Sequence, residues 1–112
     1  MDILKQISLQ TAWLREQQDL TAARIFYLLR ERGIDAKSLI CAKIFPDTKD
    51  PTGGILITPN GEVFQFAFNR IGRIVEAAQI DEWVNITRTY LQHPWRDDIL
   101  AGLAMNSSSQ QQ

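Results

Sequence analysis

The sequence predicts an α+β fold: a small, mostly antiparallel sheet of three or four strands, flanked by an N-terminal helix pair and a C-terminal helix pair. Extended runs of β-branched and aromatic residues gather in the middle of the chain, and helical spacing of apolar residues occurs before and after them. Such segregation is typical of α+β domains. We expect a strand meander that helices cover on one face, with the other face or an edge open to a partner.

The chain has 112 residues, which suffices for one domain but not for two independent cores. Hydrophobic residues make up 45% and charged residues 22%, a composition that excludes collagen-like, coiled-coil and wholly disordered proteins. We expect residues 1–105 to form the domain. Residues 106–112 are rich in Ser and Gln, and such low complexity predicts a flexible tail.

The first expected helix covers roughly residues 3 to 17. Asp2 can cap its N-terminus. Ile3, Ile7 and Leu14 fall within a narrow arc of a helical wheel, so they predict one buried stripe.

A second helix is expected to reach Arg32. Asp19 or Thr21 can cap its start, and Gly33 suits the left-handed residue that often follows a helix. One long helix bent near Gln18 is an alternative that the sequence leaves open.

The middle of the chain carries the strand signals. Residues 39 to 45 suit a short strand that Pro46 ends. The central hairpin is expected at 55–68, because Asn60 and Gly61 stand between two extended runs and tolerate the positive φ of a hairpin turn. Alternation along its second strand places the Phe residues on one face, which we expect to meet the helices.

The region after the hairpin is less clear. Residues 71–78 suit either a fourth strand or an irregular crossing. Asp81 can then cap a helix to about Gln92, and Pro94 suits the first turn of a last helix at 95–105. These two helices make up the expected C-terminal pair.

Charge and cysteine content exclude several classes of protein. Twelve Lys and Arg against thirteen Asp and Glu give a net charge of -1, which disfavours a dedicated nucleic-acid binder and a domain held by anionic lipid. The first residues lack the pattern of a signal peptide, and no run of 18 apolar residues occurs. With a single cysteine, these features favour a cytoplasmic protein with no membrane association.

We find no residues in a catalytic or metal-binding pattern, and we predict neither an enzyme nor a cofactor. Cys41, in a strand, has no thiol partner, and Lys43 is the only nearby cation to activate it, two residues along on the same expected face. His93 is alone before a proline. Adjacent carboxylates on a helix point about 100° apart, so no acid–base pair is preset. A Gly-Gly pair precedes a strand rather than a helix, which does not suit a phosphate loop.

Arginines are densest around the second helix, at Arg15, Arg24, Arg30 and Arg32. They suit either a phosphate-contacting face or a solvated helix surface, and the interleaved acids favour the latter.

The three tryptophans each fall on an apolar stripe, which favours core packing. A tryptophan that is partly exposed would instead be an interface anchor, because Trp is enriched among binding hot spots. The residues concerned are Trp13, Trp83 and Trp95.

These observations favour a small non-enzymatic protein-binding domain. In size and layout the chain is similar to bacterial immunity-type inhibitors, which neutralise a toxin or effector by binding it. The expected contacts to a protein partner are the acidic residues Asp47, Asp50, Asp97 and Asp98. Alternatives are a homodimeric regulatory or adaptor module and a nucleic-acid-binding accessory factor that uses the arginines of the second helix. A further alternative is a small enzyme whose active site cannot be recognised from the spacing of residues in the sequence.

Overall fold

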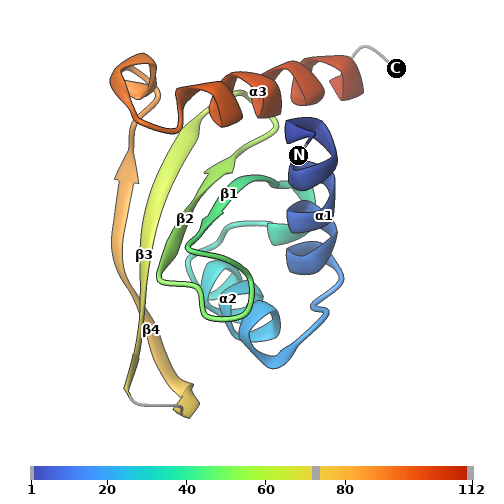
Figure 1. The fold of residues 1–112 in the computed structure, drawn as a ribbon. Helices are drawn as coiled ribbons and strands as arrows, with labels where there is room; N and C mark the ends of the chain where they lie inside the picture. Colours follow the sequence, from blue (N-terminus) through green and yellow to red (C-terminus); the bar gives the residue numbers. More distant parts are fainter. Residues whose placement is uncertain (1, 72–73, 111–112) are drawn as a thin grey trace.

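A computed structural model describes residues 2–71 and 74–110, with the backbone alone at 70–71, 74–78 and 107–110. Figure 1 shows helices against a long, twisted sheet. The elements in order are α1 (Ile3–Arg15), α2 (Leu20–Glu31), a short 3-10 helix η1 (Ala36–Ser38), β1 (Ile40–Phe45), β2 (Gly53–Ile57), β3 (Val63–Ile71), β4 (Ile74–Asn85), a 3-10 helix η2 (Tyr90–Gln92) and α3 (Arg96–Gln110).

The sheet is a four-stranded antiparallel meander in the order β1-β2-β3-β4, so the expected α+β class is confirmed. The central hairpin is also found. Ile57 of β2 pairs with Val63 of β3, and the turn between them contains Gly61 at a φ of 84°. Only glycine adopts such a φ without cost, which explains why this turn is visible in the sequence.

The expected helix at 81–92 is wrong, and with it the C-terminal helix pair. β4 continues through Asn85, and only the short helix η2 lies before α3. The apolar residues here suit a helical period and a strand period alike, and pairing with β3 decides between them. Trp83 is the register partner of Phe66, and its ring stacks on Phe64. Of the two alternatives for residues 71–78, the strand is correct in the part that the structure describes: β3 ends at Ile71 and β4 begins at Ile74.

The N-terminal helix pair is confirmed as two separate helices. Asp2 and Asp19 accept backbone N–H bonds at the starts of α1 and α2, as N-caps do. Gln17, between the helices, has a φ of 50°, which no helix accommodates. Gly33 follows α2 at a φ of 77°.

The C-terminal helix α3 runs past the expected end at 105, to Gln110. Asn106, the first residue of the expected tail, is buried and donates from Nδ2 to the carbonyl oxygens of Thr58 and Pro59 at 3.3 and 3.0 Å. The helix is thereby attached to the β2–β3 turn. Residues 111–112 lie outside the described residues, and the mobility of the tail stays a prediction.

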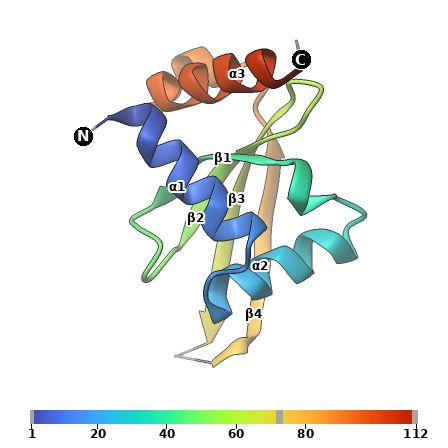
Figure 2. The same ribbon diagram turned by 90° about the vertical axis from the view of Figure 1, so that its right-hand side faces the viewer.

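Helices pack on both faces of the sheet, not on one as expected. Figure 2 shows α3 across the top of the molecule and α2 well below it. On the α2 face, Ile25 and Leu29 join Leu56 and Phe66 in one buried cluster. On the α3 face, Ile99 joins a second cluster, formed with the alternate strand residues Ile40, Ile55, Ile57 and Val63. The remaining helix, α1, supplies residues to both clusters.

Candidate functional site

The β1 edge of the sheet is closed by α1, which packs alongside it (Figure 2). Gln10 Nε2 donates to the Cys41 carbonyl oxygen at 3.2 Å, and Thr11 Oγ1 accepts from the Cys41 N–H at 3.0 Å. Arg15 Nε donates to the Leu39 carbonyl oxygen at 2.8 Å. These side chains occupy backbone groups of Leu39 and Cys41 that a further strand would need, and α1 itself packs against β1, so this edge is not available for pairing.

The β4 edge is different, because no strand of the described residues pairs with its outer side. The Ile86 N–H donates to the Val63 carbonyl oxygen at 2.8 Å, which fixes the backbone groups that face β3. Direction alternates along a strand, so the register places the N–H and C=O groups of Trp83 and Asn85 on the outer side. A bulge between Glu82 and Ile80 then shifts the alternation.

β4 also carries exposed side chains, of which Asp81 and Glu82 are acidic and Val84 is apolar. Part of the outer side of the strand is covered: Arg32 Nη2, just after α2, donates to the Ile80 carbonyl oxygen at 3.3 Å. This contact confirms the outward direction of that carbonyl group. Beyond this contact, polar backbone groups and carboxylates of the strand are exposed.

A cleft of about 470 Å³ opens on the α2 face and reaches β4. We call it the Trp83 cleft. Phe64 and Trp83 contribute aromatic rings, stacked with centroids 4.8 Å apart and planes 17° apart, and both residues are half-buried. The volume is within the range of ligand-binding clefts. The complete lining is Arg32, Ile34, Asp35, Ser38, Leu39, Thr58, Pro59, Glu62, Phe64 and Trp83.

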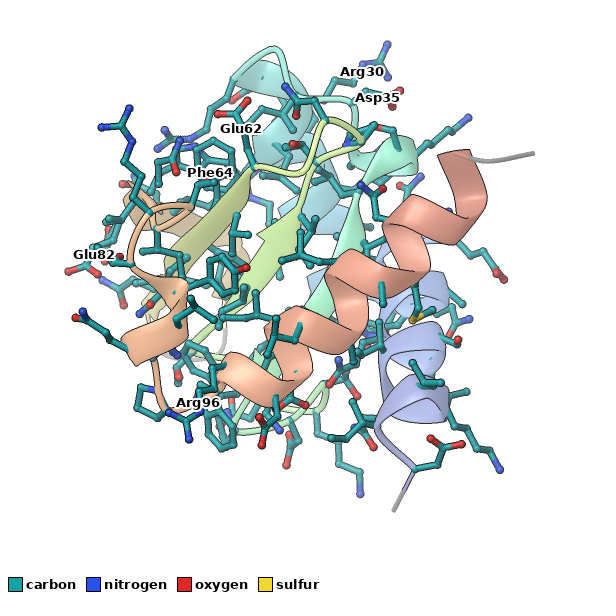
Figure 3. The ribbon with its side chains drawn as sticks, turned by 90° about the horizontal axis from the view of Figure 1, so that it is seen from above. Arg30, Asp35, Glu62, Phe64, Glu82 and Arg96 are labelled. Atoms are coloured by element: carbon teal, nitrogen blue, oxygen red, sulfur yellow. The ribbon has the colours of Figure 1, made fainter. Side chains whose placement is uncertain are left out.

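Two carboxylates and one guanidinium line the Trp83 cleft. Glu62 is held by two amides, Asn60 Nδ2 at 3.0 Å from Oε1 and Asn85 Nδ2 at 3.2 Å from Oε2. Asp35 Oδ1 accepts the Lys37 N–H at 3.1 Å. Figure 3 shows Asp35, Glu62 and Phe64 toward one end of the molecule, with Arg96 at the other end. Each carboxylate oxygen retains lone pairs for a further donor.

The four predicted acidic contacts do not form one patch. Asp47 and Asp50 lie exposed on the loop between β1 and β2, whereas Asp97 and Asp98 occupy the first turn of α3. Figures 1 and 2 both show that loop well below α3. Asp47 Oδ1 accepts the N–H groups of Lys49 and Asp50 at 2.9 and 3.1 Å, so this side chain shapes its own loop.

Cys41 is a buried core residue. Its side chain is fully covered, and burial raises the pKa of the thiol. The strand has a bulge between Cys41 and Lys43, so the expectation that they share a face is wrong. Cys41 and Ile44 lie in the cluster under α2, whereas Lys43 Nζ lies 4.2 Å from the centroid of the Trp95 ring, next to α3. Lys43 is therefore not placed to activate the Cys41 thiol.

His93 is a structural connector between η2 and the sheet. Its Nδ1 accepts the Trp95 N–H at 3.0 Å, which requires that nitrogen to be unprotonated. Nε2 therefore carries the proton and lies 2.8 Å from Gln65 Oε1, an acceptor. Both ring nitrogens are engaged, and Cys41 lies on the opposite face of the sheet.

The arginines near α2 do not form one open basic face. Arg15 and Arg32 donate to backbone carbonyl groups of the domain, and the Arg24 guanidinium lies 5.4 Å from the Tyr27 ring centroid. Arg30 is exposed. Three of the four are thus committed to contacts within the protein.

The tryptophans differ in role. Trp13 is buried, and its indole Nε1 donates to the Asp19 cap at 2.9 Å. Trp95 is 38% exposed, and Trp83 lies between burial and exposure in the cleft. A partly exposed tryptophan is the signal that could have pointed to the cleft. Sequence reasoning missed Phe64, Glu62 and Asp35 as its neighbours because they belong to separate elements.

Within the described residues, no three His, Cys, Asp or Glu side chains gather in a way that could hold a metal ion. No described helix is long and apolar enough to cross a membrane. Comparison of the chain with protein-family models, with curated proteins and with solved structures finds no match.

Proposed function

We propose that this protein is a non-enzymatic protein-binding domain, whose β4 strand receives an extended segment of another protein as a fifth strand. One observation carries the proposal: three side-chain contacts close the β1 edge, whereas no strand of the described residues pairs with the outer side of β4. Addition of a strand gives affinity through main-chain hydrogen bonds, and adjacent pockets give specificity through side chains.

Charge favours a basic partner over a second copy of the chain. Asp81 and Glu82 are exposed on β4, and two-fold pairing of β4 with itself would bring these carboxylates near each other. The same carboxylates repel phosphate groups, so they also disfavour the nucleic-acid alternative. A homodimer and a nucleic-acid complex are therefore outcomes that the tests below can reveal, rather than the function proposed.

The specific form of this proposal is an immunity-type inhibitor of bacterial origin that acts in the cytoplasm on a toxin or effector. Asp47, Asp50, Asp97 and Asp98 are proposed as additional charged contacts. They are spread over two regions, so they would act at the rim of a large interface. Cys41 and His93 support a non-enzymatic role, because the thiol is buried and both imidazole nitrogens are bonded to the fold.

The test isolates the outward N–H of Asn85. A protein captured from the source organism by the intact chain is purified, and its affinity is measured for the unmodified chain, for Asn85→Pro and for Asn85→Ala. Proline removes the N–H, whereas both variants lack the side chain, so their difference reports strand pairing. We expect binding to weaken about fivefold or more in Asn85→Pro relative to Asn85→Ala, which is the net value of one hydrogen bond.

Amide hydrogen exchange supplies a second readout. Binding should slow exchange at Trp83 and Asn85, the residues whose N–H groups face outward. Equal affinities of the two Asn85 variants with no protection on β4 would overturn the proposal. So would the absence of any captured protein, or self-association as the only binding. If the partner is a toxin or effector enzyme, loss of its activity on binding identifies the immunity-type form, and unchanged activity rejects it.

A further inference from the structure

We propose that the Trp83 cleft is a binding site for an arginine side chain of the partner strand. This inference deepens the proposed function and rests on it, because the arginine belongs to the segment that pairs with β4. It names the chemistry by which the partner is recognised. Three features carry it: the face to which the cleft opens, its aromatic rings and its two carboxylates.

The strand geometry directs a partner side chain into the cleft. Residues directly opposite each other in a sheet project from the same face. Trp83 has its backbone on the outer side of β4 and its ring on the α2 face, stacked on Phe64. A partner residue opposite Trp83 therefore projects beside the indole ring. The lining continues from Trp83 to Ser38 and Leu39 near the start of β1, so it can hold a long side chain.

The rings favour a flat cation. Guanidinium groups stack on aromatic faces and are more weakly hydrated than ammonium groups, so they lose less on leaving water. Phe64 and Trp83 stack on each other through one face each. A side chain laid along the cleft contacts the rest of the aromatic surface through its methylene groups and its planar head.

The carboxylates favour a charged donor. Glu62 is oriented by Asn60 and Asn85, and Asp35 by its contact with the Lys37 backbone. A guanidinium offers five N–H donors in a fixed plane, which matches carboxylates well. The cation already present, Arg32, offsets only one of the two carboxylate charges, so the lining keeps a net negative charge. An anionic group would meet two like charges here, and an apolar one would add no donor for the lone pairs that the carboxylates retain.

A short extended peptide tests the proposal directly. The probe is acetyl-Val-Arg-Val-amide, whose β-branched residues favour an extended chain. A second probe replaces arginine with citrulline, which has the same shape but no charge. The readout is the indole N–H signal of Trp83 in NMR titrations of the full chain, with Trp13 and Trp95 as internal references. We expect saturable shifts at Trp83 with a dissociation constant of about 1 mM, and binding at least about fivefold weaker for citrulline.

A matched pair of variants locates the charge. Glu62→Gln should weaken binding of the arginine peptide about fivefold, because it replaces a charge-assisted hydrogen bond with a neutral one. Glu16→Gln removes an exposed carboxylate at the end of α1, outside the Trp83 cleft, and should leave binding unchanged. Thermal unfolding of both variants checks that each is folded.

Four results would overturn the inference. They are no shift of the Trp83 indole signal at the highest soluble peptide concentration, equal affinity for the citrulline peptide, shifts confined to Trp95, or equal losses of affinity in the two Glu variants. The outcome is distinguishable from failure of the proposed function. A partner that depends on the Asn85 N–H while the arginine peptide does not bind leaves strand addition in place and removes the arginine site. The reverse result leaves a cation site and removes strand addition.

Discussion

The β1 and β4 edges of the sheet face the same physical problem and solve it differently. Each edge strand has backbone N–H and C=O groups that no neighbouring strand satisfies. At β1, the helix α1 supplies Gln10, Thr11 and Arg15 to these groups. At β4, one arginine contacts one carbonyl group, and exposed acids and a bulge flank the rest. Side chains seal one edge, and the other is accessible within the part of the chain that the structure describes.

The difference shows how an accessible edge strand can avoid pairing with the same edge of a second copy of the chain. Charged side chains and bulges are devices by which natural proteins prevent one edge from pairing with another. On β4, the carboxylates of Asp81 and Glu82 disfavour pairing of like edges. The same charges would attract the basic segment that we propose as the partner, so one feature would reject the wrong partner and favour the proposed one.

Removal of the side chains that seal β1 should have the largest effect on stability. The double variant Gln10→Leu and Thr11→Val leaves the N–H and carbonyl groups of Cys41 without partners. Gln10 is only 3% exposed, so little water can replace it. We expect the free energy of unfolding to fall by about 2–4 kcal/mol in urea titrations. Leu9→Gln, on the exposed side of the same helix, is the control and should change it by less than about 0.5 kcal/mol. Similar losses in both would contradict the sealing role.

Cys41, whose backbone groups α1 seals, has a buried thiol that makes the free energy of unfolding depend on pH. Because burial raises the folded-state pKa of Cys41, the unfolded chain releases the proton first as pH rises. The stability contribution is therefore complete below about pH 8.5 and declines above it, by about 1.4 kcal/mol per pH unit. Cys41→Ala lacks this decline, so its stability relative to the unmodified chain should improve between pH 9 and 10. A pH-independent difference between the two proteins in urea titrations would contradict this.

His93 lies near the open edge, because its Nε2 contacts Gln65, the register partner of Val84 in β4. Replacement by Leu removes the bonds to Gln65 and to the Trp95 N–H, which join η2 and the start of α3 to the sheet. We expect a loss of about 1 kcal/mol in the free energy of unfolding. His93→Asn, which keeps a shorter donor and acceptor, should lose less. Hydrogen exchange at the Trp95 amide should rise in the Leu variant, and an unchanged rate would show that this contact is not needed.

The smallest effect is expected on β4 itself. Val84 is 48% exposed, so Val84→Lys should alter the free energy of unfolding by no more than about 0.5 kcal/mol. Thermal unfolding measures this. A loss above about 1 kcal/mol would mean that the β4 surface is part of the core and not an accessible edge.

The elements readable from sequence were those with local causes. Caps at Asp2 and Asp19, the turn at Asn60–Gly61 and the stop at Pro46 depend on nearby backbone, and all lie at the expected boundaries. The strand at 81–85 was misread as a helix because its identity depends on β3, a pairing between distant residues. The bulge after Cys41 was invisible for the same reason, and it reversed the face of Lys43.

Most of the candidate site could not be predicted from the sequence. Asp35, Glu62 and Trp83 belong to three different connections and strands, so no spacing links them. The acidic residues chosen from the sequence are exposed as expected for three of the four, but they lie in two regions. The partly exposed tryptophan was the one available indicator, and only the fold shows which tryptophan it is.

The helix that seals β1 also joins the two faces of the sheet. Ile7, in the first half of α1, packs in the cluster beneath α3. Leu14, near the C-terminal end of α1, packs in the cluster beneath α2. Loosening this helix exposes apolar surface in both places at once. The domain is thus built to lose its structure in a single cooperative step, and a ligand that holds β4 from outside would raise the melting temperature of the whole molecule together.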